Sequence, residues 1–191
     1  MTIALNPISK NSKIGKGVRF GADLALVTVN HPDYNGVEQL SYGEKTPFVI
    51  NGPGDYEVKG IFVKGVFSSV TLSGKKYVNT IYSFSVDGMS IVFLGALASP
   101  ELDKEAREAI EAPDILFVPV GNKEVLDAKS SVKLIASLEP KIILPMDYDQ
   151  SSLKSFLKEM GEEKAEVTEK LSLRKKDLEG KEAEVIVVKA E

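Results

Sequence analysis

The chain's only histidine and two of its aspartates are the residues whose types and spacing suggest chemistry. His31 and Asp33 follow the apolar run Leu24–Val29, and Asp147 follows a second apolar run, Lys141–Pro145. Both runs are typical of buried strands. In open α/β sheets, loops just past the carboxyl ends of strands are the usual place for a site. We therefore expect any chemical centre to lie in these two loops.

The donor set limits what such a centre could bind. Catalytic zinc takes about three protein ligands from His, Cys and carboxylate, but the chain has one His and no Cys. His31, Asp33 and Asp147 are therefore the candidate metal ligands, and this set favours Mg²⁺ or Mn²⁺ over Zn²⁺. No residue is assigned a catalytic role.

A structural interpretation of the same residues stays open, and we favour it. His31 would be a hydrogen-bonded turn residue, and the aspartates would form turns or cap helices. Asp149 or Ser151, just ahead of a predicted helix, is suited to an N-cap. A serine hydrolase is excluded because no Gly-x-Ser-x-Gly elbow occurs, and no Gly-Lys-Ser/Thr phosphate loop occurs either.

Composition is that of an ordinary globular protein. The 191 residues are 43% hydrophobic and 27% charged, which predicts one domain over residues 1–191. No run approaches the ~20 apolar residues of a membrane span, no secretion signal is visible, and cysteine is absent, so we expect a cytoplasmic protein without membrane partners. The net charge of −4 argues against nucleic-acid binding. The locally basic segment Lys10–Arg19 is interpreted as a solvated loop.

The first half of the chain predicts successive strands, and the second half alternates strands with helices. Strands are predicted at 2–6, 24–29, 48–50, 56–58, 61–70, 78–86, 89–94, 114–119, 141–145, 171–174 and 183–188, and helices at 100–112, 127–138 and 151–160. A β-meander followed by strand–helix units indicates a mixed α/β fold in which sheet packs on sheet with helices outside.

Five motifs occur in an order that resembles a known family. They are Asn51-Gly-Pro-Gly-Asp-Tyr-Glu-Val-Lys-Gly60, Asn79-Thr-Ile-Tyr82, Gly88–Gly95, Asp114-Ile-Leu-Phe-Val-Pro-Val-Gly121 and Pro140-Lys-Ile-Ile-Leu-Pro-Met-Asp-Tyr148. Together they resemble the metallo-β-lactamase superfamily, specifically its branch similar to ascorbate-phosphate lactonases and often labelled Zn-dependent hydrolases. The resemblance implies a four-layer αββα sandwich whose loops hold one or two metal ions at one edge.

The same resemblance implies a degenerate metal site. The family's His-x-His-x-Asp-His motif corresponds here to His31, Asp33, Asn35 and Gly36. Its remaining three ligands, from His-x-Gly-Asp and Pro-Met-His-Tyr, fall on Phe93, Ala96 and Asp147. Among these seven positions only His31 carries the family's residue. Restoring the six others should create zinc affinity if this register holds.

Two functions follow from this resemblance as hypotheses. The first is a non-catalytic binding or structural member of the family, a pseudoenzyme with no cofactor. The alternative is a metal-dependent hydrolase of a lactone or phosphorylated small molecule, with one Mn²⁺ or Mg²⁺, and less readily Zn²⁺, at His31, Asp33 and Asp147. The sequence does not indicate which small molecule would be bound.

The family also begins with a hairpin ahead of an Asp-Pro, which corresponds here to Asn6-Pro7. The fold is therefore expected to be N-terminally shortened, and this would leave a sheet edge uncovered. An uncovered edge with apolar surroundings predicts a homo-oligomer.

Overall fold

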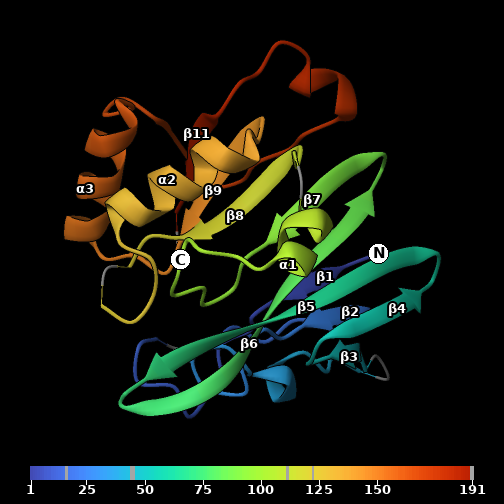
Figure 1. Ribbon diagram of the computed structural model, residues 1–191. Coiled ribbons are helices and arrows are strands. Elements are labelled where there is room, and N and C mark those ends of the chain that lie inside the picture. Colours follow the sequence, from blue (N-terminus) through green and yellow to red (C-terminus); the bar gives the residue numbers. More distant parts are fainter. Residues whose placement is uncertain (16, 44–45, 111, 122, 190–191) are drawn as a thin grey trace.

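Three short parallel strands form the smaller of two sheets in the computed structural model, which describes residues 1–15, 17–43, 46–110, 112–121 and 123–189 (Figure 1). They are β1 (Ile3–Leu5), β2 (Leu24–Leu26) and β3 (Phe48–Ile50), in the spatial order β1-β2-β3. All three residues of the central strand β2 are buried, as expected for an apolar run covered on both faces. The chain leaves β2 toward His31.

Eight strands form the larger sheet, in the order β10-β11-β9-β8-β7-β6-β5-β4. Their bounds are β4 (Gly54–Val58), β5 (Ile61–Leu72), β6 (Lys75–Val86), β7 (Met89–Phe93), β8 (Ile115–Pro119), β9 (Ile142–Met146), β10 (Glu166–Thr168) and β11 (Glu184–Val188). Strands β4 to β7 form the predicted antiparallel meander. From β7 to β10 every neighbouring pair is parallel, so the carboxyl ends of β8, β9 and β11 meet at one edge.

Three helices cover one face of the larger sheet (Figure 1). They are α1 (Lys104–Ala109), α2 (Ala128–Leu138) and α3 (Gln150–Met160). Each begins after an aspartate, Asp103, Asp127 or Asp149, whose carboxylate accepts a backbone N–H of the first turn at 2.8 Å. The capping role that we favoured for Asp149 is thereby confirmed. In the described part of the chain, no helix is long and apolar enough to cross a membrane.

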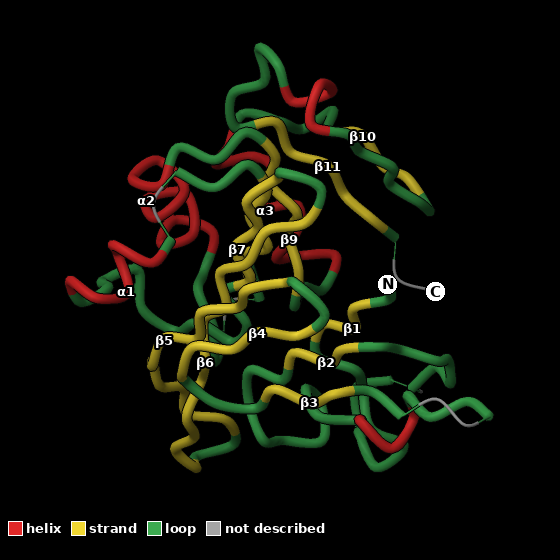
Figure 2. Tube along the Cα trace, turned by 90° about the vertical axis from the view of Figure 1, so that its right-hand side faces the viewer, coloured by secondary structure: helices red, strands yellow, loops and turns green. Residues whose placement is uncertain are grey.

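The smaller sheet packs against the opposite face of the larger one (Figure 2). Leu24 and Leu26 of β2 meet Val63, Tyr82 and Phe93 in one apolar cluster. The Tyr82 hydroxyl donates to the backbone oxygen of Val27 at 2.8 Å, which fixes the chain just beyond β2 to the larger sheet. This contact positions the loop that carries His31.

Other segments cover the faces that remain. Leu178, in the 3-10 helix η2 (Lys175–Leu178), packs with Leu171 and Leu173 against the larger sheet beside the smaller one. A second 3-10 helix, η1 (Val37–Gln39), and its flanking loops cover the outer face of the smaller sheet. The predicted mixed α/β sandwich of two packed sheets is confirmed, with its α-helices on the larger sheet.

A buried carboxylate ties the amino ends of three strands together. Asp114, with a side chain only 7% exposed, accepts from the backbone N–H of Ser90 at 2.8 Å and from Lys141 and Lys175 at 2.8 and 2.6 Å. Burial alone would raise the pKa of Asp114, but these hydrogen bonds outweigh it and hold the pKa well below its usual value. The carboxylate is therefore charged at neutral pH and joins η2 to the sheet.

Some local predictions were wrong. Residues 171–174 form no strand, because the alternating leucines face the core without a neighbouring strand to pair with; the pairing segment is β10, which is largely polar. The predicted helix 100–112 is shorter because Asp103 caps it late, and its residue 111 lies outside the described residues. The described residues of Lys10–Arg19 form an exposed loop, as predicted, and Lys16 of that segment lies outside them.

Candidate functional site

His31 lies in a tight turn after β2. The backbone N–H groups of Tyr34 and Asn35 both donate to the His31 carbonyl oxygen, at 2.9 and 2.8 Å. The ring packs edge-on against Tyr77, with centroids 5.5 Å apart. His31 is therefore held by its turn and by an aromatic neighbour.

The Nδ1 atom of His31 makes two contacts that exclude each other. It accepts the backbone N–H of Asp33 at 3.3 Å, which places the proton of the neutral ring on Nε2. It also lies 3.4 Å from Asp33 Oδ2, but an ion pair there requires a proton on the same nitrogen. The other carboxylate oxygen of Asp33 accepts from Ser12 Oγ at 2.6 Å. In the neutral form, neither ring nitrogen offers a free lone pair.

Asp147 lies at the end of β9, in the left-handed region with φ of 55°. Its Oδ2 accepts the hydroxyl of Tyr34 at 2.9 Å, so the loop after β2 is joined to the loop after β9. The residue as a whole is exposed, yet protein atoms crowd the carboxylate. This desolvation is the main cause that raises the pKa of Asp147 to about 6, against the Tyr34 hydrogen bond and with help from the charge of Asp33. Burial likewise raises the pKa of Tyr34 far above its usual value.

Gly36 is packed against the backbone of the preceding loop. A Cβ at this position would lie 2.3 Å from both the carbonyl carbon and oxygen of Ile8 and 2.4 Å from the nitrogen of Ser9. The Gly36 N–H also donates to the Pro7 carbonyl oxygen at 2.6 Å. The backbone of residues 7–9 therefore fills the space that a side chain at position 36 would need.

Phe93 and Ala96 are both buried in apolar surroundings. Phe93 is 2% exposed and meets Phe117 edge-on, with centroids 5.9 Å apart. Ala96 is fully buried and packs in a cluster with Val29 and Tyr34. These positions support the core beneath the loops.

Asn79 organises the turn that contains Ala96. Its buried amide donates to Ser68 Oγ at 2.8 Å and to the Leu94 carbonyl at 3.0 Å, and its oxygen accepts the Ala96 N–H at 2.9 Å. Gly95 follows with φ of +60° and so close to Thr28 that a Cβ would lie 2.4 Å from the Thr28 hydroxyl oxygen. The turn is thus held by a saturated amide.

The family model described as "Beta-lactamase superfamily domain" matches residues 1–147 of the chain. The chain belongs to this superfamily. A UPF0173 metal-dependent hydrolase from Thermoplasma acidophilum is 25% identical over 168 residues, covering 78% of this chain and 73% of that protein. The predicted superfamily is confirmed.

Solved structures agree with this assignment. A Zn-dependent hydrolase of the metallo-β-lactamase superfamily from Thermotoga maritima superposes with a TM-score of 0.74 and 26% identity, over 97% of this chain and 88% of that one. A metallo hydrolase from Ignicoccus hospitalis gives a TM-score of 0.59 at 17% identity, over 97% of this chain and 86% of that one; it supports the fold alone. The chain thus has the metallo-β-lactamase fold of a family of metal-dependent hydrolases.

The metal centre that the superfamily implies does not fit the residues of this chain. Loop closure brings His31, Asp33 and Asp147 to one end of the molecule, as their places after strands predicted. Position 36, however, is filled by backbone, and the positions of Phe93 and Ala96 offer no donor atoms. Within the described ranges, no three His, Asp or Glu side chains are grouped as a metal ion would require.

Sequence reasoning missed two residues of this site. Tyr34, a spacer position in the superfamily motif, fills the space between the loops and binds Asp147; an aromatic residue at a spacer inside a polar motif was the available signal. The contribution of Ile8 could not be anticipated, because it acts through its backbone across 28 residues.

Proposed function

We propose that this chain is a non-catalytic member of the metallo-β-lactamase superfamily that binds no metal cofactor and has a binding or structural role. The observation that carries the proposal is the contact of Gly36 with the Ile8 and Ser9 backbone. A histidine there would need a main-chain rearrangement and not merely a new rotamer.

The residues around this contact support the same role. The Tyr34 hydroxyl donates to Asp147 and uses one oxygen of the most promising carboxylate. Ser12 uses one oxygen of Asp33. The polar groups of the two loops are thus occupied with one another, and they hold the smaller sheet, through its His31 loop, to the end of β9.

A hydrolase that uses one divalent ion is the second candidate, and one atom favours it. The Oδ1 atom of Asn35 is buried and has no hydrogen-bond partner among the described residues, although an amide oxygen is a good ligand for a hard cation. The Thermoplasma acidophilum relative is named a metal-dependent hydrolase. In this alternative, Mn²⁺ or Mg²⁺ would be held by Asp33, Asp147 and Asn35, and the substrate would be a lactone or a phosphorylated small molecule.

Metal analysis of protein purified without chelators or affinity resins that carry metal decides between the two candidates. We expect substoichiometric zinc, manganese and iron by plasma mass spectrometry, and no saturable heat on calorimetric titration with Mn²⁺, Mg²⁺ or Zn²⁺. About one ion per chain that is lost in both Asp147→Asn and Asn35→Ala would overturn the proposal and establish the alternative. An ion retained in both variants would overturn it and place the ion elsewhere.

A further inference from the structure

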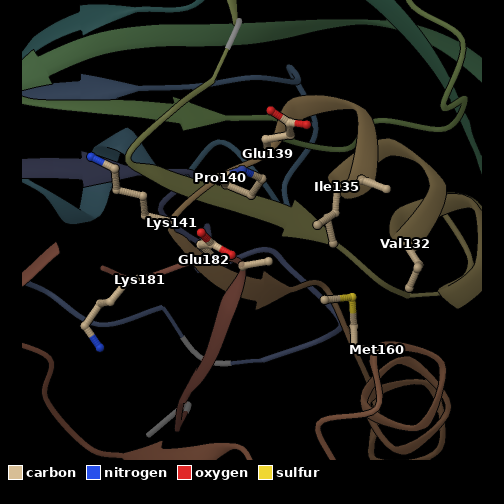
Figure 3. Close-up of a pocket in the computed structure, with 10 residues that line it drawn as sticks. Val132, Ile135, Glu139, Pro140, Lys141, Met160, Lys181 and Glu182 are labelled. Carbon is tan, nitrogen blue, oxygen red and sulfur yellow. The ribbon is translucent and has the colours of Figure 1, made fainter. Parts of the chain in front are cut away.

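A cavity of about 640 Å³ opens at the end of the larger sheet opposite to the His31 loop. It is bounded by α2, by the end of α3 and by the segments that lead into β9 and β11 (Figure 3). Lys141 at its rim precedes β9 and Asp147 follows it, so the two sites are about 20 Å apart at ~3.3 Å per residue. The cavity is therefore separate from the superfamily's site.

One side of the cavity is apolar and the other is charged. Val132, Ile135 and Met160 line one side, and Lys141, Lys181 and Glu182 line the other (Figure 3). Small-molecule sites commonly have volumes of about 300–1,000 Å³ and combine apolar walls with a few polar groups. The size and lining thus fit a small ligand with one apolar and one polar part.

Backbone hydrogen bonds preform the walls. The Ala183 N–H donates to the Pro140 carbonyl at 2.9 Å, and the Glu184 N–H donates to that of Lys141 at 3.0 Å. The last turn of α2 closes when the Glu139 N–H donates to Ile135 O, also at 3.0 Å. A ligand would therefore enter a site that needs little rearrangement.

The charges at the rim are unequally compensated. Lys141 is paired with Asp114 at 2.8 Å, and Lys181 is paired with Glu184. Glu139 and Glu182, by contrast, are exposed and make no hydrogen bond or ion pair with any residue in the described ranges. Two uncompensated carboxylates remain beside the apolar wall.

Both helices add negative potential at the same place. Because α2 and α3 each return from the carboxyl end of a parallel strand, their C-termini lie at this edge of the sheet, where each is equivalent to roughly −0.5 charge. At the end of α2, Pro140 has no N–H to donate to the carbonyl of Ala136, which lines the cavity. The backbone and the side chains therefore favour positive charge.

We propose that this cavity binds a small amphipathic organic cation of the alkylammonium class. The alkyl chain packs on Val132, Ile135 and Met160, and the ammonium group lies between Glu139 and Glu182. An anionic ligand is disfavoured because both lysines of the rim are already neutralised. This inference is independent of whether the His31 loop binds a metal.

The test uses n-octylammonium as the probe and the full-length chain labelled at methyl groups of Ile and Met. We expect saturable shifts of the Ile135 and Met160 methyl resonances with octylammonium, and none with octanoate at the same concentration. The double variant Glu139→Gln with Glu182→Gln should bind about tenfold more weakly at low salt, because two exposed ion pairs together are worth about one tenfold step. Glu57→Gln, on the far edge strand β4, is the matched control and should bind as wild type does.

A second variant tests the apolar part. Ala136→Leu adds volume from an exposed helical position on the cavity wall and should abolish binding while the unfolding midpoint stays unchanged. The proposal is overturned if octylammonium causes no saturable shift, if octanoate or octanol binds equally well, or if Glu57→Gln weakens binding as much as the double variant. It is also overturned if binding persists in Ala136→Leu.

Discussion

Replacing Gly36 with alanine tests the contact on which the proposed function depends. Gly36 has φ of −117°, which alanine adopts without backbone strain. Any loss of stability therefore comes from the added methyl group. That group would lie 2.3 Å from the carbonyl carbon of Ile8, whereas nonbonded carbon atoms sit about 3.5–4.0 Å apart. The segment around Ile8 would have to move by more than about 1 Å.

The magnitude follows from what holds that segment in place. The Gly36 N–H donates to Pro7 O at 2.6 Å and the Ser9 N–H donates to Pro32 O at 2.9 Å. Weakening these two bonds costs about 1 kcal/mol each, and overpacking in a filled site costs about 1–3 kcal/mol. Allowing for partial relaxation, we expect Gly36→Ala to lower the free energy of unfolding by about 2–4 kcal/mol.

Urea unfolding followed by circular dichroism measures this change, with Gly52→Ala as the matched control. A Cβ at Gly52 would meet no atom within 4 Å, so that variant should be neutral or slightly stabilised, by at most about 1 kcal/mol. Gly36→His should be at least as destabilised as Gly36→Ala, and it should gain no zinc affinity even when the other five superfamily ligands are restored. If Gly36→Ala lies within about 0.5 kcal/mol of wild type, the loop is not closed as described and the steric argument fails.

The remaining predictions concern stability, titration and assembly. Asp114→Asn should cost about 2–3 kcal/mol at pH 7; because the pKa of Asp114 is lowered on folding from its ordinary 3.8, its contribution is complete above about pH 4 and is lost at lower pH, so acid unfolding curves of the two proteins should converge, and parallel curves would contradict the ion network. Tyr34→Phe removes a hydrogen bond to the charged carboxylate of Asp147 and should raise its pKa above the present value of about 6, as followed by carboxyl-carbon NMR; an unchanged or lower pKa would refute the link. Asn79→Ala leaves buried backbone groups without partners and should cost about 2–4 kcal/mol in urea unfolding, whereas a loss below about 1 kcal/mol would mean that water replaces the amide. Self-association is expected because β1 and β3 are free edges of the smaller sheet and Phe48 on β3 is 55% exposed; light scattering that gives a monodisperse monomer at about 10–50 µM would contradict it.

The fold was predictable because hydrophobic period and turn chemistry are local. The continuous apolar runs at β2, β8 and β9 could only be strands covered on both faces. Asp127 and Asp149 ahead of apolar-periodic segments marked the starts of α2 and α3. The leucines at 171 and 173 gave the same period as a strand, but period specifies which way side chains face and not whether the backbone finds a partner.

The site was predictable in its place and only partly in its content. The sequence determined that His31 and Asp147 follow strands, and the strand order then brought their loops together. It also determined the losses, because glycine, phenylalanine and alanine cannot ligate a metal whatever surrounds them. Which polar group satisfies which depended on distances between loops that local patterns do not encode.

The sequence by itself determined the superfamily fold, the starts of its longer helices and the poverty of metal donors in its loops. The tertiary structure alone decided that Gly36 touches the Ile8 backbone, that Tyr34 donates to Asp147, and that α2 and α3 end beside one cavity with two unpaired carboxylates. The physical reason is separation along the chain. Helix caps and strand periods act over a few residues, whereas the Tyr34–Asp147 bond joins residues 113 positions apart, so it exists only once the two loops have met.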